Sequence, residues 1–65
     1  MPSSVIRSFR YEQPSHTLAI TFVSGRRYRY FDVPETLAEA METARSKGEF
    51  FNEKIRDRFR YARDD

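Results

Sequence analysis

The segment GRRYRYF, residues 25–31, is the central element of this 65-residue chain. The segments before it are expected to pair with it as strands, and those after it to cover it as helices. It opens on a glycine and then places Tyr28 and Tyr30 two positions apart among three arginines. Side chains two positions apart in a strand point to the same face of a sheet. Both tyrosines are therefore expected on one face, and Arg27 and Arg29 on the other. The segment predicts a β-strand with one aromatic face and one basic face.

The strand before this segment, residues 17–23, is expected to pair with it as a hairpin. Its β-branched and aromatic composition is typical of a half-buried strand, and three apolar residues share one face: Leu18, Ile20 and Phe22. A two-residue loop would place Ile20 opposite Arg29, whereas a three-residue loop would place it opposite Tyr28. Because a slip of one residue moves every side chain to the other face, the apolar pattern favours the three-residue loop. Gly25 then takes the left-handed position of a G1 bulge.

Apolar residues before and after this hairpin are spaced as one more strand and a helix. Residues 5–11 alternate loosely, which predicts a strand, although Arg7 interrupts the pattern. Pro34 and Glu35 suit the first turn of a helix, and an apolar stripe follows to about Arg45. The first helix is therefore expected over residues 34–45.

A second helix is predicted from Ser46, because Ser46 and Glu49 have the spacing of a capping box. Its expected buried and polar stripes run almost to the end of the chain: Phe51, Ile55, Phe59 and Ala62, and Asn52, Arg56, Arg60 and Arg63. Residues 56–61 also alternate charged and apolar side chains, so an extended segment from Phe59 onward is the alternative.

The order of these elements predicts one α+β domain over residues 1–65. Its fold is a three-stranded antiparallel β-meander followed by two short α-helices packed on one face of the sheet. The chain has no cysteine for a disulfide, so six phenylalanines and four tyrosines must supply much of the small core. Association is a common support at this size, and we expect a monomer or a weak homodimer.

The basic residues are concentrated in the first half of the chain. Residues 1–31 hold five arginines against a single glutamate, whereas residues 32–65 hold seven basic and nine acidic residues. The net charge of +2 alone does not indicate nucleic-acid binding. The basic excess around the central strand is typical of a solvated charged face, and a patch that binds an anionic ligand is the alternative.

Several classes of function find no support in the sequence. No apolar run approaches 18 residues and no charged-then-apolar leader is present, so we expect no membrane span or secretion and a cytoplasmic location. His16 is the only histidine, and without cysteine a metal site or a Cys–His pair lacks ligands. A glycine-rich phosphate loop is also missing. We therefore expect no enzymatic activity, no metal and no cofactor.

A set of short motifs, in order along the chain, resembles the KTSC domain family. They are Ser3-Ser4, Leu18-x-Ile20-x-Phe22, Ser24-Gly25, the central Tyr28-Arg29-Tyr30, Val33-Pro34, SKGEFFN at 46–52 and Ile55-Arg56. The resemblance runs from about Ser3 to Tyr61. It implies a small domain that occurs at the C-terminus of some lysyl-tRNA synthetases and as free-standing small bacterial proteins. RNA binding has been suggested for the family from that attachment, and the resemblance identifies no ligand site.

The basic strand face is the first candidate binding site. Arg27 and Arg29 are expected about 7 Å apart, because each strand residue advances about 3.3 Å. Phe31 has the same parity and would add a stacking ring, and Arg7 or Arg10 of the first strand would extend the patch. Such a patch predicts weak, salt-sensitive contacts with phosphates and no choice of sequence.

Tyr28 and Tyr30 have two interpretations. Aromatic residues on a strand beside arginines stack RNA bases in several sheet-based modules, which requires exposed rings. The register argued above instead directs both rings toward Leu18 and Ile20. It favours partly buried core tyrosines whose hydroxyl groups reach a hydrogen-bond partner.

A second candidate anion site lies at the start of the second helix. Lys47 and Gly48 are expected at a helix N-terminus, where backbone N–H groups and the dipole favour an anion. Asn52 and Arg56 are expected one turn apart on one helical face. The alternative is structural: Gly48 permits a tight turn between helices, and the two polar side chains bond to backbone or to nearby acids.

These patterns predict a non-catalytic binding domain with RNA or another nucleic acid as the leading ligand. The alternative is a protein-interaction module or a homo-oligomerising accessory domain. Its arginines and exposed aromatic residues would then contact a protein partner or a second copy. Salt separates the two hypotheses, because phosphate contacts weaken steeply as salt rises and an apolar interface does not.

Overall fold

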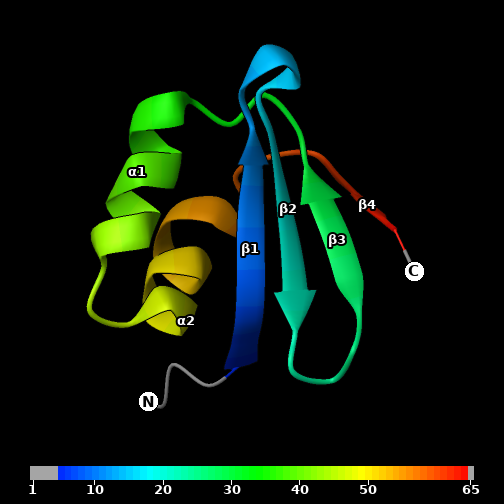
Figure 1. Ribbon diagram of the computed structural model, residues 1–65, viewed down its shortest axis with the longest axis vertical. Coiled ribbons are helices and arrows are strands. Elements are labelled where there is room, and N and C mark those ends of the chain that lie inside the picture. Colours follow the sequence, from blue (N-terminus) through cyan, green and yellow to red (C-terminus); the bar gives the residue numbers. More distant parts are fainter. Residues whose placement is uncertain (1–4, 65) are drawn as a thin grey trace.

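The computed structural model describes residues 5–64, which form a four-stranded antiparallel sheet with helices against one face (Figure 1). The strands lie side by side in chain order: β1 Ile6–Glu12, β2 Thr17–Phe22, β3 Arg27–Tyr30 and β4 Tyr61–Arg63. The helices are α1 (Glu35–Thr43) and α2 (Lys47–Phe50), and α2 continues into a π-helical turn, η3 (Phe51–Ile55). The predicted α+β class is confirmed, with a fourth strand added to the meander.

The β2–β3 hairpin has the predicted three-residue register. Ile20 lies opposite Tyr28, and Leu18 lies opposite Tyr30. The Phe22 carbonyl accepts a hydrogen bond from the Gly25 amide at 2.9 Å. Gly25 has a φ of 96°, a backbone conformation that residues with a side chain rarely adopt. The turn and the apolar pattern therefore select the same pairing.

A bulge in β1 explains the interrupted alternation at Arg7. Ile6 lies opposite Phe22 and Ser8 lies opposite Thr21, so the register shifts between Ile6 and Ser8. The extra residue is exposed, and the shift allows Ile6 to pack against the core. β1 is joined to β2 by a short 3₁₀ turn, η2 (Gln13–Ser15).

The core lies between the inner face of the sheet and the helices. Its largest fully buried side chains are Leu18, Ile20, Val33, Met41 and Ile55. The Tyr11 hydroxyl donates a hydrogen bond of 2.6 Å to the Val33 carbonyl, which ties β1 to the segment that enters α1. α1 begins directly after Pro34, as predicted, and ends two residues before Arg45.

The second helix is much shorter than its spacing predicted, and the prediction was wrong beyond the first turns. Ser46 does cap α2, because its Oγ accepts from the Glu49 amide at 3.3 Å. The helical stretch ends where the Arg56 amide donates to the Phe51 carbonyl at 2.8 Å. Arg56 then adopts an extended ψ of 134° and Asp57 a left-handed φ of 66°, which turn the chain back toward the sheet.

Residues 61–63 form β4 in place of the last helical turn, as the extended alternative allowed. Phe59 still packs against the core from the turn before β4, so its apolar contact does not require a helix. Ala62, expected on the buried stripe, is exposed, and Arg60 and Arg63 leave the predicted polar stripe. β4 pairs with β3 and satisfies backbone groups that would otherwise form an open edge.

Candidate nucleic-acid interface

The sheet face that points away from the helices carries the predicted arginines. Arg29 lies opposite Ala19, and Arg27 lies opposite Thr21, so both have the predicted placement. Arg10 of β1 pairs with Ala19 from the other side. Small side chains on β2 therefore separate the arginines of the two neighbouring strands. We call Arg10, Arg27 and Arg29 the basic face.

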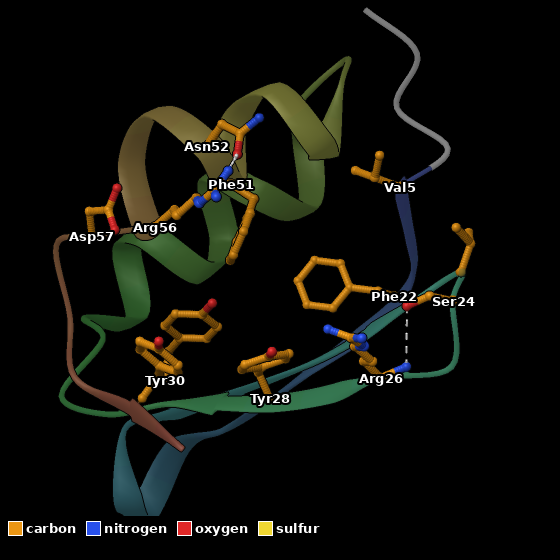
Figure 2. A pocket seen from close by; sticks show the side chains of 12 residues that line it. Val5, Phe22, Ser24, Arg26, Tyr28, Tyr30, Phe51, Asn52, Arg56 and Asp57 are labelled. Carbon is orange, nitrogen blue, oxygen red and sulfur yellow. Dashed lines mark hydrogen bonds between the residues drawn. The ribbon is translucent and has the colours of Figure 1, made fainter. Parts of the chain in front are cut away.

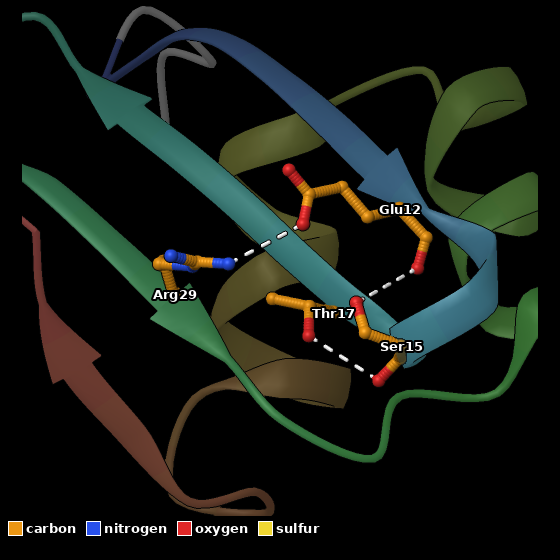
Figure 3. A network of polar contacts seen from close by, with 4 residues as sticks. All are labelled: Glu12, Ser15, Thr17 and Arg29. Carbon is orange, nitrogen blue, oxygen red and sulfur yellow. Dashed lines mark hydrogen bonds and ion pairs between the residues drawn. The ribbon is translucent and has the colours of Figure 1, made fainter.

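Arg29 is held by an acidic neighbour on the same face (Figure 3). Its Nη2 lies 3.3 Å from Oε1 of Glu12, and the two side chains are 40% and 39% exposed. Nearby, Thr17 donates to the Ser15 carbonyl at 3.3 Å, which holds the start of β2 against the η2 turn. Ion pairs at this exposure contribute about 0–1 kcal/mol. Arg29 is thus partly neutralised, yet its partner is displaced at little cost.

The other two arginines of the basic face, Arg10 and Arg27, differ from Arg29 in this respect. Within residues 5–64, neither Arg10 nor Arg27 makes an ion pair. Both are exposed. Their guanidinium groups are therefore available to an anionic ligand.

The inner face of the sheet holds Tyr28 and Tyr30, which line an open cleft of about 560 Å³ (Figure 2). The helices lie toward β1, whereas β3 and β4 extend beyond them (Figure 1). The cleft opens over this less covered part of the sheet, opposite Asn52 and Arg56. We call it the tyrosine cleft, after the tyrosines that line it: Tyr28, Tyr30 and Tyr61.

A chain of aromatic contacts forms the floor and one wall of the tyrosine cleft. The Tyr30 ring packs edge-on against Phe51 with centroids 5.3 Å apart, and it lies 6.4 Å from the Tyr28 ring in a stacked arrangement. Tyr61 of β4 lies 5.5 Å from both tyrosine rings. Exposure rises from 5% at Tyr30 to 59% at Tyr61, with Tyr28 half-buried between them. The core interpretation therefore holds for Tyr30, while Tyr28 contributes to both the core and the cleft.

The hydroxyl groups of these three tyrosines have no hydrogen-bond partner among residues 5–64, so the predicted partners for Tyr28 and Tyr30 are not found there. Every buried side-chain polar atom of those residues is paired, so the three hydroxyls are open to solvent in the cleft. Burial of the ring and the neighbouring Tyr61 and Tyr28 raise the pKa of Tyr30 to about 12 from its ordinary value of 10.0. The Tyr30 hydroxyl therefore keeps its proton well above neutral pH.

This shift predicts a specific loss of stability at high pH. Between pH 10 and pH 12, Tyr30 is ionised in the unfolded chain but still protonated in the folded one. The contribution of Tyr30 to the free energy of unfolding is therefore complete below pH 10 and is lost as the pH rises toward 12. Urea unfolding at about pH 9 and about pH 11 should show a smaller decrease in midpoint for Tyr30→Phe than for the parent. Tyr61→Phe should keep most of the parent's decrease, because Tyr30 and its burial, the largest cause of the raised pKa, remain. Equal decreases in all three proteins would contradict the prediction.

The remaining residues of the first candidate site are Arg7 and Phe31. Arg7 occupies the β1 bulge and is exposed. Phe31 is half-buried, and the Arg60 guanidinium lies 5.8 Å above its ring centroid. Arg60 is also paired with Asp32 at 3.1 Å. Phe31 already has a cation over its ring, so it is the weakest of the predicted stacking residues.

The second candidate anion site is split by the structure. The Lys47 ammonium donates to the carbonyls of Glu42 and Ala44 at 3.1 and 3.2 Å, where it complements the C-terminal end of α1. Gly48 is buried. Asn52 and Arg56 do lie one turn apart, and Arg56 donates to the Asn52 Oδ1 at 3.2 Å. Lys47 is thus bound to the end of α1 and Gly48 is buried in α2, whereas Asn52 and Arg56 line the tyrosine cleft.

Two polar or aromatic cleft residues, Arg26 and Tyr61, were not among the predicted site residues. Tyr61 was assigned either to the end of the second helix or to an extended segment. Two sequence signals could have identified them. Arg26 precedes Arg27 and therefore points to the opposite face of the sheet, and Tyr61 ends the run of alternating charged and apolar residues at 56–61. Within residues 5–64, no group of three or more potential metal ligands is found. In the same range, no helix is long and apolar enough to cross a membrane.

The sequence matches the family model of the KTSC domain over residues 2–59, which is most of the chain. This chain belongs to the KTSC domain family. The match confirms the resemblance seen in the motifs around Tyr28-Arg29-Tyr30.

Relatives of this KTSC domain include both free-standing and attached forms. A crystal structure of a KTSC domain protein from Yersinia pestis superposes with a TM-score of 0.93 at 32% identity, covering 100% of this chain and 92% of the other. An uncharacterised protein from Stutzerimonas stutzeri is 36% identical and 93% covered. A lysine–tRNA ligase from Nostoc punctiforme is 47% identical over 58 residues, or 89% of this chain. This KTSC domain spans only 10% of that ligase's length.

Proposed function

We propose that this KTSC domain is a non-catalytic RNA-binding domain of the cytoplasm that contacts the phosphate backbone through the basic face. The observation that carries the proposal is an uncovered sheet face on which two arginines, Arg10 and Arg27, have no acidic partner within residues 5–64. Relatives named lysine–tRNA ligase support RNA as the anion, because they are named for an RNA substrate.

The spacing of the basic face suits an extended nucleic-acid backbone. Arg27 and Arg29 lie two residues apart in β3, or about 7 Å along the strand. Arg10 and Arg29 flank β2, which places their backbones about 10 Å apart. Ala19 and Thr21 between them are short and keep the surface flat. Contacts of this kind are weak, depend on salt and do not distinguish sequences.

The test is a titration of the isotope-labelled domain with short single-stranded RNA of mixed sequence, followed by amide chemical shifts at low and moderate salt. We expect shifts centred on Arg10, Arg27 and Arg29 that diminish as salt rises. Shifts that are insensitive to salt, or no shifts at millimolar RNA in low salt, would reject the proposal. That outcome would favour the protein-interaction module instead.

A further inference from the structure

We propose that the tyrosine cleft is a second binding site, which captures an unpaired base of the RNA strand by stacking. The ligand class is a flat aromatic ring that carries a phosphate. The role of this site in binding RNA rests on the proposed function. The cleft itself is a separate feature, on the face of the sheet opposite the basic face.

The size and lining of the cleft match a small aromatic ligand. Its volume of about 560 Å³ lies within the roughly 300–1,000 Å³ of small-molecule sites. Tyr28 and Tyr61 line it and are more exposed than Tyr30 and Phe51, which also line it. Figure 2 shows Tyr28 and Tyr30 on the sheet, facing Phe51 from the helix. Aromatic rings in open grooves stack bases of any sequence, because every base has a π-face.

The charges around the cleft select an anion. Arg26 from the hairpin and Arg56 from the end of η3 both line it, against one carboxylate, Asp57. Within residues 5–64, the side chain of Arg26 forms no ion pair. The contact with Asn52 orients the Arg56 guanidinium and leaves its other N–H groups available. Two guanidinium groups disfavour a cationic ligand in this aromatic site and favour a phosphate.

The tyrosine hydroxyls supply adaptable polar contacts. Those of Tyr28, Tyr30 and Tyr61 have no partner among residues 5–64 and are open to the cleft. A hydroxyl both donates and accepts, so it can bond to the edge of any base. The cleft is therefore expected to require a base and to show only modest preference among the four.

The β2–β3 hairpin connects the cleft to the basic face. Arg26 lines the cleft, and its neighbour Arg27 stands on the opposite face of the sheet. An RNA strand that crosses the tip of the hairpin would contact Arg26 and then Arg27. The two sites can therefore bind neighbouring nucleotides of one strand.

The experiment compares two ligands, a four-nucleotide RNA and an abasic ribose-phosphate strand of the same length. The basic face should respond equally to both, whereas shifts at Tyr28, Arg56 and Tyr61 should appear only with the RNA. Quenching of tyrosine fluorescence by the RNA should accompany them, because the chain has no tryptophan and three of its four tyrosines line the cleft. Equal responses of the cleft to both strands, or none to either, would overturn the stacking site while leaving the basic face testable.

Tyr61→Ala provides the matched variant, because Tyr61 is 59% exposed and its loss leaves the buried core intact. RNA affinity should fall at least about fivefold, the lower end for the loss of one base stack, while affinity for the abasic strand should not change. Unchanged RNA affinity in this folded variant would also overturn the inference. A cleft that binds RNA without any shift at the basic face would instead reject the proposed function and keep the stacking site.

Discussion

Replacing Tyr30 with alanine is expected to lower the free energy of unfolding by about 3–5 kcal/mol, the usual cost of removing a buried aromatic side chain. Tyr30 is 5% exposed and contacts rings from two other elements, Phe51 of η3 at 5.3 Å and Tyr61 of β4 at 5.5 Å. A domain of this length has roughly 3–10 kcal/mol of stability in total. We therefore expect Tyr30→Ala to be largely or wholly unfolded, as measured by urea denaturation followed by circular dichroism.

Two control variants separate the buried ring from its hydroxyl and from aromatic content in general. Tyr30→Phe should stay folded and lose less than about 1 kcal/mol, because the hydroxyl has no hydrogen-bond partner among residues 5–64. Tyr61→Ala should lose only about 1 kcal/mol, because its ring is mostly exposed. If Tyr30→Ala were no less stable than Tyr61→Ala, the placement of Tyr30 in the core would be wrong.

Removing two charges from the basic face is expected to have the largest effect on RNA binding. In the double variant Arg10→Gln/Arg27→Gln, two phosphate contacts are lost and affinity at about 0.1 M salt should fall on the order of tenfold. The slope of log affinity against log salt should decrease by about 1.4, since each contact with single-stranded RNA contributes about 0.7. Fluorescence anisotropy with a labelled oligonucleotide at several salt concentrations measures both quantities.

The matched control removes two charges elsewhere. Arg45→Gln/Lys54→Gln changes two exposed cations outside the basic face and the tyrosine cleft. Both double variants lower the net charge by the same amount from +2. The control should therefore keep nearly all of the affinity and the salt slope. An equal loss in the two variants would mean that net charge, and not the basic face, governs binding.

Local sequence patterns predicted the β2–β3 hairpin because its signals are independent and agree. Gly25 marks the residue with positive φ, and the period-two pattern of the strands places Tyr28 opposite Ile20. Either signal alone leaves a second register open, whereas together they determine which face each tyrosine and arginine occupies. The cap at Ser46 and the start of α1 after Pro34 were predicted on the same local basis.

Local sequence patterns did not predict the structure correctly where a helix and a strand fit the sequence equally well. Residues 56–63 have an apolar spacing that fits a helical stripe and an alternation that fits a strand. In the fold, Phe59 reaches the core from a turn, and β4 pairs with the edge of β3. That edge belongs to residues about 30 positions earlier in the chain, so its unpaired backbone groups cannot be inferred from the sequence around residues 56–63.

The candidate sites divide in the same way. Strand alternation was enough to predict that Arg27 and Arg29 share one face and that Tyr28 and Tyr30 share the other, since side-chain direction alternates along any strand. The contacts that already occupy some of these groups could be seen only in the folded chain: Glu12 pairs with Arg29, and Lys47 binds carbonyls at the end of α1. The fold also brings Tyr61 of β4 beside Tyr28. Contacts between distant segments depend on how the close-packed core fits together, and that fit involves residues from every part of the chain.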